Sequence, residues 1–299
     1  LSCLCGSEPA MLGIAKQLDG ARDEGGKLTK VYFDMQKQVQ MLGRELPIAT
    51  NEIASMVAES LKMGVGKKDV IEFTKVVAEM GTAFELPVDQ LAQDMGKIAN
   101  MYKIPIKNID DLADTINYLD DKAIASGKDI IDFMQRVGGT ASMVKISDKN
   151  TAALGSTLLT LGEKAETSAT AINAVFSKLG AANTQSKPFR AMVEELGLTT
   201  GQLGRGMQTD AIGTIFEVMD KIKQLPKVAK DGQTSQIDAV ATLFGAEHWD
   251  TFSKLMENRA ELEKQLRLST SSDASGSMSR EFKARMETTE AQWQTFKNR

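Results

Sequence analysis

The side chains that most often carry catalysis or bind metals are scarce in this chain. His248, in the stretch AEHWD, is the single histidine of the 299 residues, so a zinc motif with paired histidines is excluded. Nucleophilic triads need a histidine or another base beside a serine or cysteine, and the Gly-x-Ser-x-Gly elbow is absent. We interpret His248 as a capping or half-buried residue, and we expect no catalytic, cofactor-binding or metal-binding residue.

Two cysteines and several acidic pairs are the remaining candidates for chemistry. Cys3 and Cys5 lie in the short leader LSCLCGSEPA, and a C-x-C pair alone does not complete the four-ligand set of a structural zinc site. Asp110-Asp111 and Asp120-Asp121 are neighbours in sequence, so on a helix their carboxylates point in different directions. An enzyme whose metal site is assembled from acidic residues stays open as an alternative, which metal-dependent thermal stabilisation would support.

Binding of phosphates, nucleic acids or membranes is not indicated either. The stretch GARDEGGKL, 20–28, lacks both the glycine spacing and the Ser or Thr after lysine that a phosphate-binding loop requires, and we interpret its glycines as interrupting a helix. The 36 basic and 40 acidic residues leave a net charge of −4, which gives no general attraction for nucleic acid. No apolar run approaches the length of a membrane span.

Hydrophobic periodicity predicts that α-helices build this protein. Aromatic residues make up only 5% of the chain while methionine occurs 16 times, a composition that favours helices over a large β fold. The phrases LPI at 46–48, LPV at 86–88 and IPI at 104–106 each precede a new helical pattern, as expected where proline ends one helix and opens the next. One apolar stripe recurs at steps of three and four through Val70, Phe73, Val77, Met80 and Phe84.

A second copy of this pattern follows about 60 residues later. GKKDVIEF at 66–73 is echoed by GKDIIDF at 127–133, and Thr140 stands where the first copy has methionine. Asp69 with Glu72, and Asp129 with Asp132, occupy the positions of helix caps. The repeated stripe consists of Ile130, Phe133, Val137 and Val144. We predict an all-α, multi-helix array of antiparallel helical hairpins with an internal duplication at this offset.

Amino-acid composition and the positions of helix-breaking residues divide the chain into four predicted segments. These are an N-terminal leader and helical segment at 1–46, a compact helical core at 47–268, a serine-rich linker at 269–277, and the start of a further amphipathic helix at 278–299. Within the core, the glycine-rich stretch at 197–206 predicts a loop, and one longer helix is predicted over 247–267. The last helical pattern meets no stop signal before Arg299, so we expect the natural chain to continue.

Several segments, taken in order, resemble the core region of phage tail tape measure proteins. The similarity covers about residues 45–299, while the leader at 1–10 departs from the pattern. The segments that carry it are MGVGKKDVIEFTKVVAEMGTAFELPVDQLA at 63–92, SGKDIIDFMQRVGGTASMVKIS at 126–147, AALGSTLLTLGEKAETSATAINAVFSKL at 152–179, LFGAEHW at 243–249 and METTEAQWQTFKNR at 286–299.

This resemblance implies a structural role in a bacteriophage or prophage tail. Such proteins are non-enzymatic scaffolds that lie in the tail lumen, and their length sets the length of the tube that polymerises around them. The implied partners are tail tube subunits, tail assembly chaperones and baseplate or tail-tip proteins, with assembly in the host cytoplasm and self-association. The alternative is a helical-repeat adaptor that binds a partner in a groove, for which three or more regular repeats would be expected.

Overall fold

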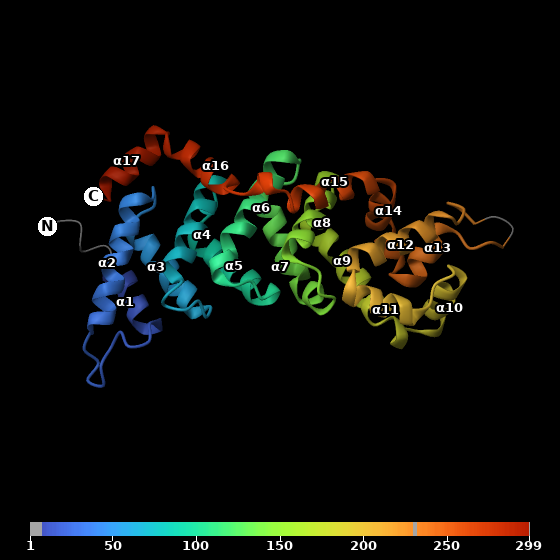
Figure 1. Cartoon of the computed structure of the whole chain (residues 1–299), viewed down its shortest axis with the longest axis horizontal. Helices are drawn as coiled ribbons and strands as arrows, with labels where there is room; N and C mark the ends of the chain where they lie inside the picture. The colour runs from blue at the N-terminus through green and yellow to red at the C-terminus, as the bar shows by residue number, and fades with distance from the viewer. Residues whose placement is uncertain (1–7, 230–231, 299) are drawn as a thin grey trace. The chain divides into compact units, whose positions relative to one another are not determined.

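The computed structural model describes residues 8–229 and 232–298, and over those residues the protein is all-α (Figure 1). The described part contains seventeen α-helices, four short 3-10 helices and one isolated antiparallel bridge between Arg22 and Leu28. The predicted all-α fold is therefore confirmed. The sequence forms helices because apolar residues recur at helical spacing between proline and glycine stops.

Contacts divide the chain into two compact units. Unit 1 comprises residues 1–117 and 273–299, and unit 2 comprises 118–272, so unit 1 is built from two stretches separated in sequence. The helices of unit 1 are α1 (Glu8–Gln17), α2 (Lys30–Glu45), α3 (Thr50–Lys62), α4 (Val70–Phe84), α5 (Val88–Tyr102), α6 (Ile109–Lys122, which crosses the boundary), α16 (Ser277–Met286) and α17 (Thr289–Lys297). The helices of unit 2 are α7 (Gly127–Met143), α8 (Asp148–Thr160), α9 (Ala165–Gly180), α10 (Lys187–Glu195), α11 (Thr200–Thr209), α12 (Ala211–Lys223), α13 (Gln236–Leu243), α14 (Trp249–Glu257) and α15 (Arg259–Ser269).

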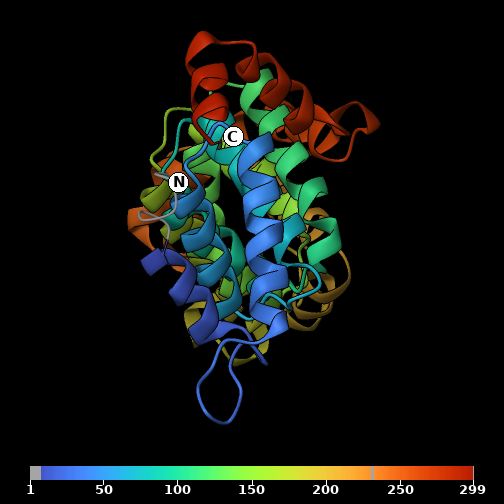
Figure 2. The ribbon, with the colours of Figure 1, turned by 90° about the vertical axis from the view of Figure 1, so that its left-hand side faces the viewer.

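The core of unit 1 lies between α1, α3, α4 and α5. Helix α3 packs against α1, α4 and α5, and Figure 2 shows the loop 18–29 projecting beyond the ends of α1 and α2. The predicted stripe of α4 is buried from Val70 to Met80, while Phe84 at its end is half-buried. All three proline turns separate helical elements as predicted, since α3, α5 and the 3-10 helix Ile106–Asn108 follow them.

The core of unit 2 is centred on α7, α8 and α9. Helix α7 packs on α8 and α9, and α15 packs on α8. Phe133 and Phe176 are fully buried, and a Cβ atom added at Gly155 would lie 2.3 Å from the Cδ1 atom of Phe133. The glycine of α8 therefore makes room for the Phe133 ring.

The turns after α4 and α7 have the same backbone geometry. Glu85 and Lys145 both adopt the left-handed region, with φ of 56° and 53°. The next amide closes each turn, from Leu86 to the carbonyl of Gly81 at 3.0 Å and from Ile146 to that of Ala141 at 3.1 Å. These equivalent pairs are separated by the predicted offset, although the duplication as a whole stays a prediction.

The predicted aspartate caps are wrong in detail. Asp69 precedes α4 but its side chain makes no capping hydrogen bond. At α7 the cap is Ser126, whose hydroxyl accepts a hydrogen bond from the Asp129 amide at 3.2 Å. Asp129 therefore lies within the first turn of α7, where its negative charge interacts favourably with the positive N-terminal end of the helix dipole.

Three predicted boundaries also differ from the structure. The glycine-rich stretch predicted as a loop at 197–206 mostly forms α11, because Thr199 caps it and Gly206 permits the close approach of Thr214, 2.3 Å from an added Cβ. The helix predicted over 247–267 is broken at Asn258, whose side chain donates to the Lys254 carbonyl at 2.8 Å. The helix predicted from 278 onward is interrupted before Thr288, which caps α17.

Candidate interaction surface

The sequence candidates for catalysis and metal binding do not converge. His248 is buried, with its Nε2 3.6 Å from Glu247, while Asp120 accepts a hydrogen bond from the Gly127 amide at 2.6 Å. Asp121 pairs with neighbouring Lys122 at 2.8 Å, whereas the pair 110–111 lies in the first turn of α6. Cys3 and Cys5 lie outside the described residues. Among the residues described, no group of three or more His, Cys, Asp or Glu side chains could hold a metal ion, and no helix could cross a membrane.

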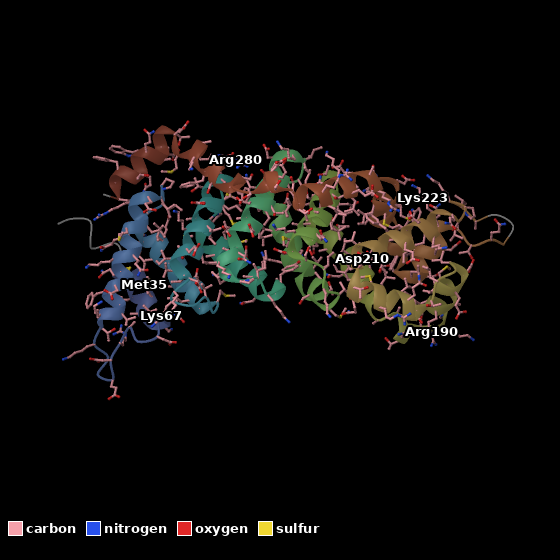
Figure 3. All side chains as sticks on the ribbon, viewed as in Figure 1. Met35, Lys67, Arg190, Asp210, Lys223 and Arg280 are labelled. Carbon is pink, nitrogen blue, oxygen red and sulfur yellow. The ribbon has the colours of Figure 1, made fainter. Side chains whose placement is uncertain are left out.

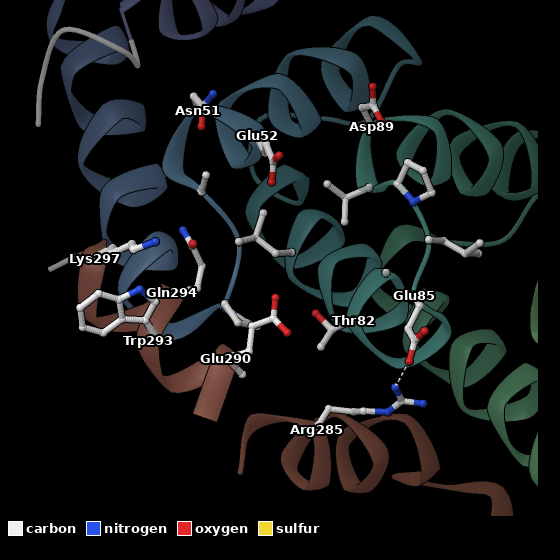
Figure 4. Close-up of a pocket in the computed structure, with 18 of the residues that line it drawn as sticks. Asn51, Glu52, Thr82, Glu85, Asp89, Arg285, Glu290, Trp293, Gln294 and Lys297 are labelled. Carbon is white, nitrogen blue, oxygen red and sulfur yellow. Dashed lines mark hydrogen bonds and ion pairs between the residues drawn. The ribbon is translucent and has the colours of Figure 1, made fainter. Parts of the chain in front are cut away.

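A groove of about 930 Å³ lies in unit 1 (Figure 4). Two proline turns form one side of it, the α2–α3 turn with Pro47 and Ile48 and the α4–α5 turn with Pro87 and Val88. Helices α16 and α17 complete it from the other end of the sequence. The side chains of Glu85 and Arg285, which are 200 residues apart in sequence, therefore meet in this groove.

We call residues 273–298 the C-terminal strap, because they return to unit 1 after the chain has traversed unit 2. Its first anchor is Asp114 of α6, whose carboxylate accepts hydrogen bonds from the amides of Gly276 at 2.6 Å and Met278 at 2.9 Å. Gly276 precedes α16 and has no side chain with which to cap it, so Asp114 supplies the cap. Beside it, Asn117 donates to the hydroxyl of Ser277 at 2.6 Å, and both residues are buried.

The second anchor of the strap lies at its other end. The side-chain amide of Asn298 donates to the carbonyls of Gly43 at 2.8 Å, Leu46 at 3.3 Å and Ile48 at 2.6 Å. These carbonyls belong to the end of α2 and the turn after it, where backbone acceptors lack partners within the helix. At the first anchor Asp114 thus satisfies backbone amides of the strap, and at the second Asn298 of the strap satisfies backbone carbonyls of the rest of unit 1.

An ion pair closes one side of the groove. Arg285 hydrogen-bonds to Glu281 at 2.9 Å and to Glu85 across the groove, and these bonds raise the pKa of its guanidinium. Figure 4 shows the Arg285–Glu85 contact below the α4–α5 turn. Because two carboxylates face this one guanidinium, Arg285 adds little free positive charge to the groove.

Unpaired carboxylates and an exposed tryptophan line the remainder. Glu52, Asp89 and Glu290 are exposed and form no ion pair with another described residue. Trp293 is 57% exposed and stacks on Phe296 with ring centroids 5.7 Å apart. The Lys297 ammonium lies 5.5 Å from the Trp293 ring centre, within cation–π range.

A half-buried carboxyl lies near the first anchor of the strap. Burial raises the pKa of Glu79 above its ordinary value of 4.5; the charge of Asp114 acts in the same direction, while Lys75 and Lys283 oppose the shift. The folded protein therefore binds this proton more readily than the unfolded chain does. The contribution of Glu79 to stability falls as pH rises from about 4.5 through its raised native pKa.

Sequence reasoning missed this groove because its two sides come from distant parts of the chain. The paired proline turns were visible as LPI and LPV, and they do line it. The return of the strap had no local signal, since Asp114 and Asn298 look like ordinary surface polar residues in the sequence.

Comparison with known proteins supplies the family. A family profile described as phage-related minor tail protein matches residues 36–245, more than two thirds of the chain. No curated protein and no solved structure gives a significant match. The matched region extends from α2 to the end of α13 and thus includes helices of both units. The chain belongs to the family of phage-related minor tail proteins.

Proposed function

We propose that this chain is the folded core module of a tail tape measure protein. The observation that carries the proposal is the family match over residues 36–245, together with the ordered resemblance of segments between 45 and 299. In this role the protein lies in the tail lumen, and its length determines where polymerisation of the tube stops. The helical composition and the packed, multi-helix units support a scaffold.

The geometry of the described helices limits how they take part in measuring. The longest of them, α7, has 17 residues and spans about 25 Å at a rise of about 1.5 Å per residue. A continuous helix of the whole chain would reach about 450 Å. We therefore propose that these residues form an anchoring module and that extended measuring helices lie elsewhere in the full-length protein.

The proposed role is non-enzymatic and depends on protein contacts. Tube subunits, tail assembly chaperones and baseplate or tail-tip proteins are the proposed partners, with assembly in the host cytoplasm. Near-balanced charge over the chain is consistent with partners that are proteins rather than nucleic acid. Thermal unfolding with and without divalent cations tests the enzymatic alternative, because a resident metal would raise the melting temperature.

Tail length tests the proposal directly. In-frame deletions in the extended part of the full gene are expected to shorten tails by about 1.5 Å for each residue removed, the rise of an α-helix. Electron microscopy of purified particles measures this slope. Deletions that leave tails at their original length, while particles still assemble, would contradict a measuring role.

A further inference from the structure

We infer that the groove of unit 1 is a docking site for a basic segment of a partner protein, one that presents lysine or arginine beside an apolar side chain. This inference concerns a surface that does not depend on how tail length is set. It rests on three features of the groove: its apolar wall, its unpaired acidic side chains and its exposed tryptophan.

The apolar part of the groove gives a partner side chain somewhere to bury. Ile48 and Ala291, both buried, line it together with Pro47, Pro87 and Val88 of the two proline turns. A volume of about 930 Å³ accommodates several side chains of a bound segment. Proline turns are rigid, so this wall is formed before any partner arrives and less entropy is lost on binding.

The charge around this wall selects a cationic partner. Four carboxylates line the groove, from Glu52, Glu85, Asp89 and Glu290, against the cations Arg285 and Lys297. Arg285 is already bonded to Glu85 and Glu281, which leaves the other three carboxylates without an ionic partner among the described residues. Figure 4 shows Glu52 and Glu290 beside the groove, while Glu85 is directed toward Arg285. An acidic segment would be repelled there, while lysine or arginine side chains would be attracted.

Trp293 provides the third feature. More than half of its surface is exposed, although large aromatic side chains are usually buried or held at interfaces. The strap fixes its position, because Ala291 and Asn298 on either side of it are anchored. An incoming cation can take the place of Lys297 over the indole ring, and tryptophan is the strongest cation–π acceptor among side chains.

Tryptophan fluorescence tests the inference on the full chain. In a Trp249→Phe background, Trp293 is the remaining tryptophan and reports on the groove alone. The probe is a dodecapeptide of lysine, leucine and alanine, with a counterpart in which glutamate replaces lysine. We expect the lysine peptide to shift Trp293 emission at low salt, the glutamate peptide to leave it unchanged, and salt to weaken the binding.

Two double variants show whether binding depends on the carboxylates of the groove or on the negative charge of the protein as a whole. The double variant Glu52→Gln with Glu290→Gln is expected to weaken binding of the lysine peptide roughly fivefold to tenfold. The control, Asp19→Asn with Glu24→Gln, removes the same charge from the exposed loop between α1 and α2 and should bind normally. Equal loss in both variants, equal binding of the glutamate peptide, or self-association of the chain through Trp293 without peptide binding would overturn the inference.

Discussion

Replacing Phe133 with alanine is expected to lower the free energy of unfolding by about 3–5 kcal/mol, the largest effect of any single substitution considered. Phe133 is fully buried in α7, and α8 meets its ring at Gly155, where there is no room for a methyl group. Removing the ring leaves a cavity that neighbouring backbone cannot fill. Urea denaturation followed by circular dichroism measures the loss.

A substitution at Gly155 tests whether Gly155 and Phe133 pack against each other as a pair. Gly155→Ala forces a Cβ atom to within 2.3 Å of the Phe133 ring, so it is expected to cost about 1–3 kcal/mol. Combining it with Phe133→Leu should recover part of that cost, giving a coupling free energy of about 1 kcal/mol. Exposed Phe296→Ala is the control and should change stability by no more than about 0.5 kcal/mol. If Phe133→Ala costs as little as the control, the packing of α7 on α8 described here is wrong.

Replacing Asp114 with alanine is expected to release the C-terminal strap from unit 1. Its carboxylate accepts two backbone hydrogen bonds at the start of α16, and bonds to a charged group contribute about 1.5–3 kcal/mol each. A loss of about 2 kcal/mol would speed local opening of α16 roughly 30-fold. Hydrogen exchange of peptides within 277–297 measures this opening, and faster tryptic cleavage after Arg280 should accompany it.

The matched control for the strap is Asp111→Asn. Asp111 lies on the same helix but is exposed, and no side-chain contact of its carboxylate with the strap is present among the described residues. This variant should leave exchange in α16 unchanged while the Asp114 variant accelerates it. Equal protection of the strap in both variants would show that Asp114 does not hold it.

Local features of the fold could be predicted from sequence, and the reasons are physical. The stripe of Val70, Phe73, Val77 and Met80 is buried as expected, because helical spacing alone decides which side of a helix is apolar. Proline turns were equally predictable, since proline cannot continue the preceding helix. The prediction of a loop at 197–206 is wrong for most of the stretch because Gly206 allows α11 to pack closely on Thr214, a neighbour outside that stretch.

The candidate site could not be predicted from the sequence because it depends on contacts between residues that are distant in the chain. Asp114 caps α16 by accepting a hydrogen bond from Gly276, 162 residues later in the chain, and Arg285 pairs with Glu85 across 200 residues. The periodicity of apolar residues in the sequence indicates neither of these two pairings. In the stretch 269–277, whose serine-rich composition predicts a linker, Ala274 and Ser277 are buried and the Ser277 hydroxyl accepts a hydrogen bond from Asn117.

Small-angle scattering of residues 118–272 distinguishes a packed helical body from a measuring rod in this part of the tail protein. A compact unit of this length should have a radius of gyration of about 15 Å. The same residues in one continuous helix would form a rod with a radius of gyration above about 60 Å. We expect the smaller value together with a helical circular dichroism spectrum, and a rod-like scattering profile would show that these residues do not pack into a compact unit.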